Sequence, residues 1–213
     1  MVETILVCAA HADDAELGAG GTIAKYAQEG KRVITVVFSF GEKSSPWLKE
    51  EIIIANRKKE AKEIGTFLGC AETIFLGLAD TKLQEEIKDP KIKEIMKRIL
   101  QRFQPSKVFV LSASDPHPDH RATHTLTLQA VEEFDKEKKI QVYTYEVWNV
   151  VSQDDPVIYV DVTKTFKTKL AALRKFKSQK VSVYMLIVPV VIRALLSGLR
   201  NKCRFAEKFY RIR

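Results

Sequence analysis

Cysteine is scarce in this sequence, and the three cysteines present are too far apart to suggest a local disulfide or metal site. Cys8, Cys70 and Cys203 form no CxxC pair, which excludes the usual cysteine-based metal motifs. An odd number of widely spaced thiols suits a reducing compartment. The N-terminus also lacks a charged and then apolar leader. We therefore expect a cytoplasmic protein in which the cysteines are core residues.

Long apolar runs and nucleic-acid motifs are missing as well. Residues 181–192 are almost wholly apolar, but a run of about 12 residues containing Pro189 is shorter than the ~20 that a bilayer requires. Aromatic residues do not alternate with the basic ones, and no known nucleic-acid motif occurs. We therefore expect no nucleic-acid partner. No repeat or linker divides the 213 residues, a length that fits one domain.

Acidic residues are nearly absent from the last quarter of the chain. From Lys164 onward there are 14 Lys and Arg against a single acid, Glu207, so this part has a net charge of +13. Because the whole chain has a net charge of +8, the first 163 residues carry −5. Two interpretations of residues 181–192 stay open. The segment is either core or a contact between subunits of a homo-oligomer, or it is a surface lid that meets an anionic membrane at its periphery.

What the sequence does contain is an alternation of strand and helix patterns. Strands are expected at residues 4–10, 32–38, 73–76, 107–111, 141–148 and 157–162, and helices at about 20–29, 49–68, 90–103, 122–136 and 165–176. Repeated strand–helix units predict an α/β fold, with a mainly parallel, Rossmann-like sheet covered by helices on both faces. We divide this single domain into a core, 1–180, and an apolar and basic extension, 181–213, packed on it.

Two polar clusters contain or adjoin all four histidines of the chain. Residues 11–16 (HADDAE) follow the first apolar run, and residues 112–121 (SASDPHPDHR) follow the run 107–111, with His124 just beyond. In parallel sheets the loops at the carboxyl ends of strands bind ligands. Imidazole nitrogens and carboxylate oxygens can both bind a borderline cation such as zinc. The two clusters therefore predict a metal site. We expect His124 to have a structural role and not to be a ligand.

A glycine-rich turn after the first strand raises a competing dinucleotide-binding hypothesis. The glycines begin only at Gly18, the third position of G-x-G-x-x-G would be Ile23, and no acid ends the second strand. This pattern does not favour a dinucleotide cofactor.

The clusters resemble the two signatures of the LmbE-like (PIG-L) family of zinc-dependent N-acetylglucosamine de-N-acetylases. The similarity lies in His11-Ala12-Asp13-Asp14 with Gly20-Gly21 and in His117-Pro118-Asp119-His120. Weaker pieces follow the family order at residues 57–61, 68–69, 76–80, 161–163, 178–179 and 205–209. The resemblance implies an LmbE-like three-layer fold, one Zn²⁺ per chain and hydrolysis of an acetamide on an amino sugar.

The resemblance also implies roles for individual residues. Three side chains are the implied zinc ligands: His11, Asp14 and His120. Zinc with three protein ligands keeps an open position and lowers the pKa of water toward ~7. Asp13, adjacent to a ligand, is free to act as general base, and His117 to stabilise the oxyanion or protonate the leaving amine. Asp119 is expected to orient an imidazole.

Other positions match the family pattern only in part. Arg57 and Asp80 resemble family residues that bind sugar hydroxyls, with an exposed helix arginine and a turn aspartate as the alternatives. The family tyrosine before the second motif is absent, leaving Ser112, Ser114 and Asp115 there. Alanine also replaces the usual proline at position 12, which loosens the turn without removing a ligand.

The substrate is left open between two kinds of amino sugar. One is a soluble sugar such as diacetylchitobiose, and the other is an N-acetylglucosaminyl-inositol conjugate, which the basic C-terminal part would suit. Two further alternatives are an amidase acting on another N-acyl conjugate and a metal-containing interaction protein without catalysis.

Overall fold

A seven-stranded sheet forms the centre of the computed structural model, which describes residues 2–44, 47–147 and 154–213. The sheet order is β3-β2-β1-β4-β5-β7-β6. The strands are β1 (Thr4–Ala9), β2 (Arg32–Ser39), β3 (Glu72–Leu78), β4 (Lys107–Leu111), β5 (Gln141–Tyr145), β6 (Val157–Asp161) and β7 (Ala206–Arg211). The predicted strand end at Trp148 lies outside the described residues.

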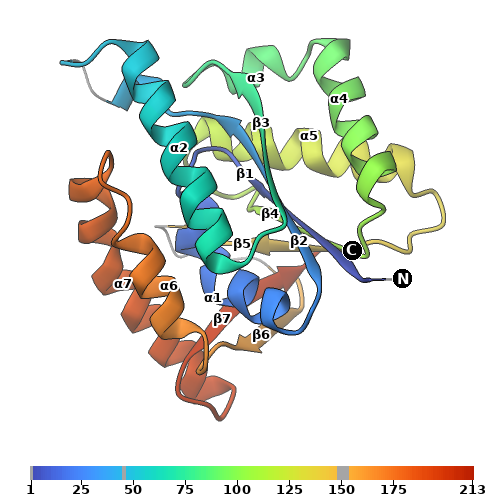
Figure 1. Ribbon diagram of the computed structural model, residues 1–213. Coiled ribbons are helices and arrows are strands. Elements are labelled where there is room, and N and C mark those ends of the chain that lie inside the picture. The colour runs from blue at the N-terminus through green and yellow to red at the C-terminus, as the bar shows by residue number, and fades with distance from the viewer. Residues whose placement is uncertain (1, 45–46, 148–153) are drawn as a thin grey trace.

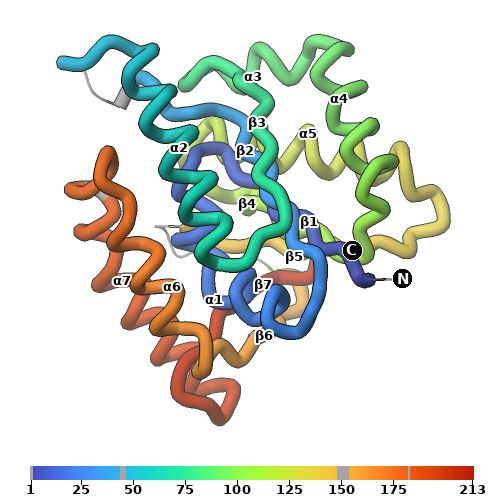
Figure 2. Tube along the Cα trace, viewed as in Figure 1, coloured from blue at the N-terminus to red at the C-terminus, as the bar shows by residue number. Residues whose placement is uncertain are grey.

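Helices cover both faces of this sheet (Figures 1 and 2). They are α1 (Asp14–Gln28), α2 (Glu50–Leu68), α3 (Leu83–Glu86), α4 (Pro90–Phe103), α5 (Pro118–Phe134), α6 (Phe166–Leu173) and α7 (Lys180–Arg200), with a short 3₁₀ turn at Glu42–Ser44. One layer contains α1 against α2 and α6, and the other contains α4 and α3 against α5. The predicted α/β class and three-layer arrangement are confirmed.

The central strands are apolar throughout because both of their faces are covered. All six residues of β1 are buried, and β1 pairs in parallel with β2 on one side and β4 on the other. Strands buried on two faces show continuous hydrophobic runs rather than alternation. From β1 the chain adds β2 and β3 on one side of the sheet and then β4 and β5 on the other. The crevice between β1 and β4 is therefore the topological switch point where such sheets bind ligands.

Two helices begin earlier than their sequence pattern predicted. Helix α1 begins at Asp14 instead of Gly20, and α5 begins at Pro118 instead of residue 122. The glycines taken for a loop lie inside α1, where they allow close packing. A Cβ at Gly18 would lie 2.2 Å from the Tyr145 ring, and one at Gly21 would lie 2.9 Å from Val162 Cβ.

The C-terminal stretch contributes both a long helix and an inserted strand. Residues 181–192 belong to α7, and β7 lies between β5 and β6, antiparallel to both. Strand β6 is thus joined to the rest of the sheet through β7. The 181–213 extension supplies part of the sheet itself.

Candidate metal centre and active site

The first polar cluster is positioned by the start of α1. Asp13 is the N-cap of this helix, without a side-chain cap hydrogen bond, and its carbonyl oxygen accepts from Leu17 N at 3.0 Å. Asp14 Oδ2 turns back to accept from His11 N at 2.8 Å. The Asp14 carboxylate is therefore fixed by His11 N, whereas the Asp13 carboxylate is not used to cap the helix. The turn places His11 and Asp14 side by side after β1.

The second polar cluster is positioned by the start of α5. Asp115 Oδ1 accepts from His117 N at 2.8 Å, and His117, the N-cap, accepts from Asp119 N at 3.2 Å through Nδ1. Pro118 occupies the first helical position, where the missing N–H costs nothing. Asp119 and His120 consequently lie in the first turn, directed toward the end of β1.

The structure brings together the three residues that the family resemblance implies as ligands. One ligand atom from each of His11, Asp14 and His120 lies within 4.8 Å of the others. Asp14 Oδ1 is 3.4 Å from His120 Nε2, and Asp14 Oδ2 is 3.5 Å from His11 Nδ1. Two imidazole nitrogens and one carboxylate oxygen form a ligand set that suits zinc.

A second set of three shares one of these residues. His11, His117 and Asp119 also bring one ligand atom each within 4.8 Å of the others. The Nδ1 of His117 already accepts a backbone hydrogen bond, which places the proton of the neutral ring on Nε2. A ring in this tautomer has a donor rather than a lone pair at Nε2. His117 is half-buried, at the rim, whereas His120 is fully buried.

Buried carboxyl groups dominate the electrostatics around the imidazoles. Five are less than 10% exposed: Asp13, Asp14, Asp80, Asp115 and Asp119. Asp119 Oδ1 has no hydrogen-bond partner among the described residues. Clustered carboxylates are stable inside a protein when a cation offsets their charge. The donor types and this excess of negative charge therefore fit a divalent cation.

The carboxylates also determine the pKa values of the two inner imidazoles. Burial lowers the pKa of His120, but Asp14 and Asp115 outweigh it and raise the pKa to about 9. Burial likewise opposes protonation of His11, yet Asp119, Asp14 and Asp80 raise its pKa well above the usual value. Without a metal the cluster thus retains protons, and a metal ion would have to displace them. Burial and the charges of His120 and His11 lower the pKa of His117.

Asp13 is adjacent in sequence to the ligand Asp14 and interacts with two further polar side chains. Burial and the charge of Asp14 raise the pKa of Asp13, and the Arg57 guanidinium opposes this shift. A hydrogen bond from Gln179, just before α7, also favours the Asp13 carboxylate. Arg57 is 5% exposed and donates from Nη1 to the Phe40 carbonyl oxygen at 2.8 Å. It is therefore not the exposed helix arginine of the alternative interpretation.

Two aspartates hold the ring of His11 from the side opposite Asp14. Asp80 Oδ1 and Asp119 Oδ2 lie 3.3 Å and 3.4 Å from His11 Nε2. Each carboxylate is fixed in turn by a backbone donor, since Asp80 accepts from Lys43 N at 3.1 Å and Asp119 from Thr81 N at 2.8 Å. Asp80 is thus a buried neighbour of the cluster rather than an exposed turn residue.

Two residues of this site had no role assigned to them from the sequence. Asp115 Oδ2 lies 3.1 Å from His120 Nδ1, the arrangement by which a carboxylate orients a metal-binding imidazole. Its position two residues before His117 was the available signal. Gln179 falls in the weak family match at residues 178–179, but its contact with Asp13 had no local signal, because the two residues are 166 positions apart and only the packing of α7 brings them together.

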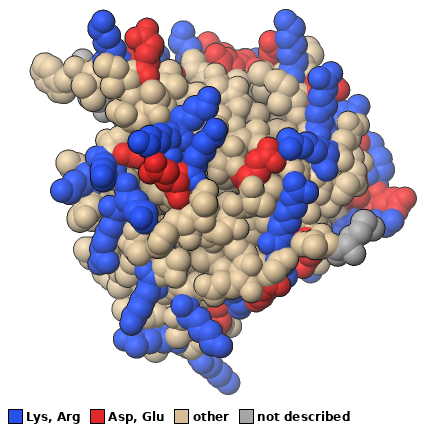
Figure 3. All heavy atoms as spheres, viewed as in Figure 1, with Lys and Arg blue, Asp and Glu red and all other residues tan. Residues whose placement is uncertain are grey.

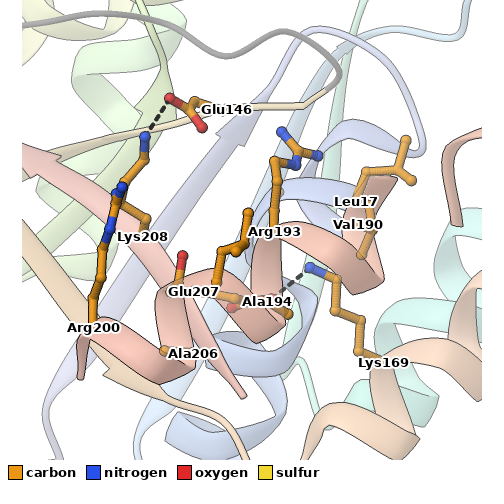
Figure 4. A pocket seen from close by; sticks show the side chains of 13 residues that line it. Leu17, Glu146, Lys169, Val190, Arg193, Ala194, Arg200, Ala206, Glu207 and Lys208 are labelled. Carbon is orange, nitrogen blue, oxygen red and sulfur yellow. Dashed lines mark hydrogen bonds and ion pairs between the residues drawn. The ribbon is translucent and has the colours of Figure 1, made fainter. Parts of the chain in front are cut away.

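A separate cavity of about 200 Å³ lies away from this cluster, between α1, α7 and β7 (Figure 4). Ion pairs join Lys169 to Glu207 at 2.6 Å and Lys208 to Glu146 at 2.8 Å along its wall. Arg193 from α7 also lines it. None of the implied ligands lines this cavity, so it is not the predicted active site.

Comparisons with known proteins show what this chain is similar to. The chain is 30% identical over 178 residues to an uncharacterised deacetylase, YaiS, of Escherichia coli, covering 82% of this chain and 90% of that protein. The structure of the N,N'-diacetylchitobiose deacetylase of Pyrococcus horikoshii superposes with a TM-score of 0.82 and 25% identity, covering 99% of this chain and 84% of that one. The 4-oxalmesaconate hydratase of Pseudomonas putida is 28% identical over 196 residues, covering 84% of this chain and 74% of that protein.

The predicted family and the prediction of an enzyme are both confirmed by these relatives. The match to the family covers both histidine clusters, since it extends over residues 6–131. The chain belongs to the PIG-L family, described as GlcNAc-PI de-N-acetylase.

Proposed function

We propose that this protein is a zinc-dependent hydrolase that removes the acetyl group from an N-acetylglucosamine-containing substrate. The observation that carries the proposal is the cluster of His11, Asp14 and His120 with Asp13 beside it, at the switch point of the sheet. The deacetylases among its relatives support the reaction type, and diacetylchitobiose, the substrate in one relative's name, supports the class of sugar.

In this proposal His11, Asp14 and His120 hold one zinc ion per chain. When bound, the ion supplies a Lewis acid that polarises the amide carbonyl and lowers the pKa of water. Asp115 and Asp119 keep the two imidazoles in place, through the 3.1 Å contact with His120 and the 3.4 Å contact with His11. The ligands are thereby pre-oriented at little entropic cost.

Asp13 is the proposed general base. Its carboxyl group is adjacent in sequence to the ligand Asp14, yet the helix start separates the two side chains. A base must lie within hydrogen-bond reach of the attacking water, and Asp13 flanks the proposed zinc position without being occupied as a cap. Gln179 and Arg57 position the carboxylate.

His117 is the proposed donor to the oxyanion. Its backbone-fixed Nδ1 leaves Nε2–H as the donor, and the ring centroid lies 5.1 Å from that of His11 at the open side of the cluster. Donors aimed at the developing negative charge stabilise the tetrahedral intermediate of acyl transfer. His117 thus supplies what the absent tyrosine would have supplied.

Arg57 and Asp80 complete the proposed pocket as positioning residues on the sugar side. Both are buried; Arg57 interacts with Asp13 through its charge, and Asp80 contacts His11. Substitution of either residue is expected to alter KM for a sugar substrate together with kcat.

Acetate release tests the proposal. Zinc-loaded protein is incubated with N-acetylglucosamine, with diacetylchitobiose and with an N-acetylglucosaminyl-inositol phospholipid in vesicles. Asp13→Asn is expected to lower kcat at least a hundredfold while the protein still binds one zinc ion, because the base is lost but the ligands remain. Asp89→Asn, at the exposed start of α4, is the matched control and should leave the rate unchanged.

The other outcomes each point to a different function. Release of acetate from a different N-acyl conjugate alone would make the protein an amidase of other specificity. Hydration of an unsaturated acid without acetate release would place it with the hydratase relative. Zinc binding with no turnover, unchanged by Asp13→Asn, would indicate an interaction protein. Any of these results would overturn the proposed function.

A further inference from the structure

Helix α7 has one buried face and one exposed apolar face. Val183, Val190 and Ala194 are at most 4% exposed and pack into the domain. Eight apolar residues on the other side are more than 40% exposed: Val181, Tyr184, Met185, Val188, Ile192, Leu195, Leu196 and Leu199. We call these eight residues the α7 stripe.

The stripe is continuous and has no equal elsewhere in the described residues. Its members recur every three to four positions, so they line one side of a helix of 21 residues, about 31 Å long. Of the fifteen large apolar side chains that are exposed among the described residues, eight belong to the stripe. The other seven are distributed over the N-terminus, the 47–52 segment, α2, α4 and β6. A contiguous exposed apolar surface of this kind marks an interaction site.

The buried face of α7 is anchored too firmly for the helix to cross a membrane. The window Val183–Arg200 is long and apolar enough to span by length and composition. However, the Arg193 guanidinium donates to the Val147 carbonyl oxygen, and Arg193 lines the cavity in Figure 4. A Cβ on Gly198 would lie 2.6 Å from the backbone oxygen of Arg204. The helix is therefore fixed along its length, and only its stripe is available to a partner.

Positive charges flank both ends of the stripe. Lys177 and Lys180 are exposed at its start, and Arg200, Lys202 and Arg204 are exposed at its end. Glu207, the one acid after residue 164, is buried in its ion pair with Lys169. Lys and Arg side chains gather over α6 and α7, at the lower left of Figure 3, with little negative charge among them.

We propose that the α7 stripe docks on an anionic membrane surface, with the helix lying in the interface plane. Amphipathic helices bind membranes in this way when an apolar face is bordered by Lys and Arg, which attract acidic head groups. A second copy of the chain fits the stripe poorly, because pairing two stripes in either direction brings their flanking lysines and arginines toward one another.

Docking would also place the proposed active site close to the membrane. The stripe begins two residues after Gln179, whose side chain hydrogen-bonds Asp13. The base and the first turn of α7 therefore share one edge of the molecule. The proposal does not rest on the deacetylase activity, since lipid binding is measured without a substrate.

Vesicle co-sedimentation of the full chain tests the docking surface. Phosphatidylcholine vesicles with and without phosphatidylglycerol are compared at low and high salt. Ile192→Gln reduces the apolar surface of the stripe. Ile95→Gln on α4, across the sheet, is the matched control, because the two isoleucines have similar exposed fractions of 51% and 38%. Lys180→Gln with Lys202→Gln removes flanking charge, and Lys93→Gln with Lys97→Gln on α4 is the corresponding control.

The expected result is salt-sensitive binding to the acidic vesicles. Removal of the flanking lysines should weaken the partition coefficient about fivefold for each lysine, and Ile192→Gln should weaken it at least threefold, with both controls unchanged. Absence of binding, or equal binding of wild type and Ile192→Gln, would overturn the proposal. So would a dimer in sedimentation velocity that Ile192→Gln converts to a monomer, which would identify a second copy as the partner.

Discussion

At the scale of single residues, the site depends on how adjacent side chains are directed apart. Asp13 and Asp14 differ by one position, yet one is the N-cap of α1 and the other is its first helical residue. The hydrogen bond from His11 N to Asp14 Oδ2 fixes the second carboxylate toward the histidines. In the proposed mechanism, this separation lets Asp14 serve as ligand and Asp13 as base.

Asp115 provides a test of how His120 is oriented. The variant Asp115→Asn keeps the acceptor for His117 N but removes the negative charge 3.1 Å from His120 Nδ1. Loss of such a partner typically weakens metal binding 10–100-fold, so we expect about a tenfold rise in the Kd for zinc. Competition with a chelating indicator measures this Kd. Ser114→Ala, at the exposed neighbouring position, should leave it unchanged. An unaltered Kd in Asp115→Asn would assign Asp115 to the fold of the loop alone.

The sequence identified the ligand candidates because their chemistry is local. His11 and Asp14 occur within four residues, and His117 and His120 are equally close, so each half of the site is visible as a short motif. The contacts of Asp80 with His11 and of Gln179 with Asp13 depend on the packing of distant elements. No spacing rule connects such pairs, and for this reason their contacts emerge only from the fold.

At the scale of elements, the buried parallel strands have a local sequence signal, whereas the start of α1 and strand β7 depend on tertiary packing. Buried parallel strands show continuous apolar runs, and their predicted positions are close to those observed. The glycines of α1 suggested a loop because their packing against Tyr145 and Val162 is tertiary. Strand β7 was overlooked as an element because its sequence, AEKFYR, has neither a continuous apolar run nor strict alternation, and because it enters the sheet from the end of the chain.

Glu3 connects the starts of three strands, at the end of the sheet opposite the metal centre. It accepts from Ser106 Oγ at 2.8 Å, forms an ion pair with Lys107 and lies 3.3 Å from Lys31 Nζ. The hydrogen bonds from Lys107 and Ser106 lower the pKa of Glu3 to about 2. A carboxyl pKa that is lower in the folded state stabilises the fold above the unfolded value of 4.5. This stabilisation is lost as the pH falls from about 4.5 toward 2.

We therefore expect Glu3→Gln to destabilise the protein at pH 7 by about 1 kcal/mol, the upper end for a partly exposed ion pair. The difference from wild type should shrink as the pH falls through 4.5 and vanish near pH 2. Urea unfolding at several pH values measures both quantities. Glu63→Gln, in the exposed pair with Lys59, is the control and should show almost no difference. A pH-independent effect of Glu3→Gln would attribute it to packing instead of charge.

At the scale of the whole molecule, the candidate metal centre draws its residues from both helical layers. His11 and Asp14 lie at the start of α1 on one side of the sheet, and His120 lies in the first turn of α5 on the other. An ion bound by all three would join these layers across the switch point. Because an unfolded chain cannot hold the three ligands together, zinc binding should stabilise the folded state.

The thermal unfolding temperature measures this linkage directly. Free zinc at a hundred times its Kd stabilises a one-site protein by about 2.7 kcal/mol, which corresponds to about 5–10 °C in Tm for a chain of this length. The chelator-treated protein should unfold that much lower and recover when zinc is returned. His11→Ala should show no zinc-dependent shift, whereas His124→Gln, whose Nδ1 contacts the Leu111 carbonyl oxygen at 2.8 Å, should keep it. A shift that survived in His11→Ala would place the stabilising ion elsewhere, because only Asp14 and His120 of the ligand set would remain and a zinc site needs at least three protein ligands.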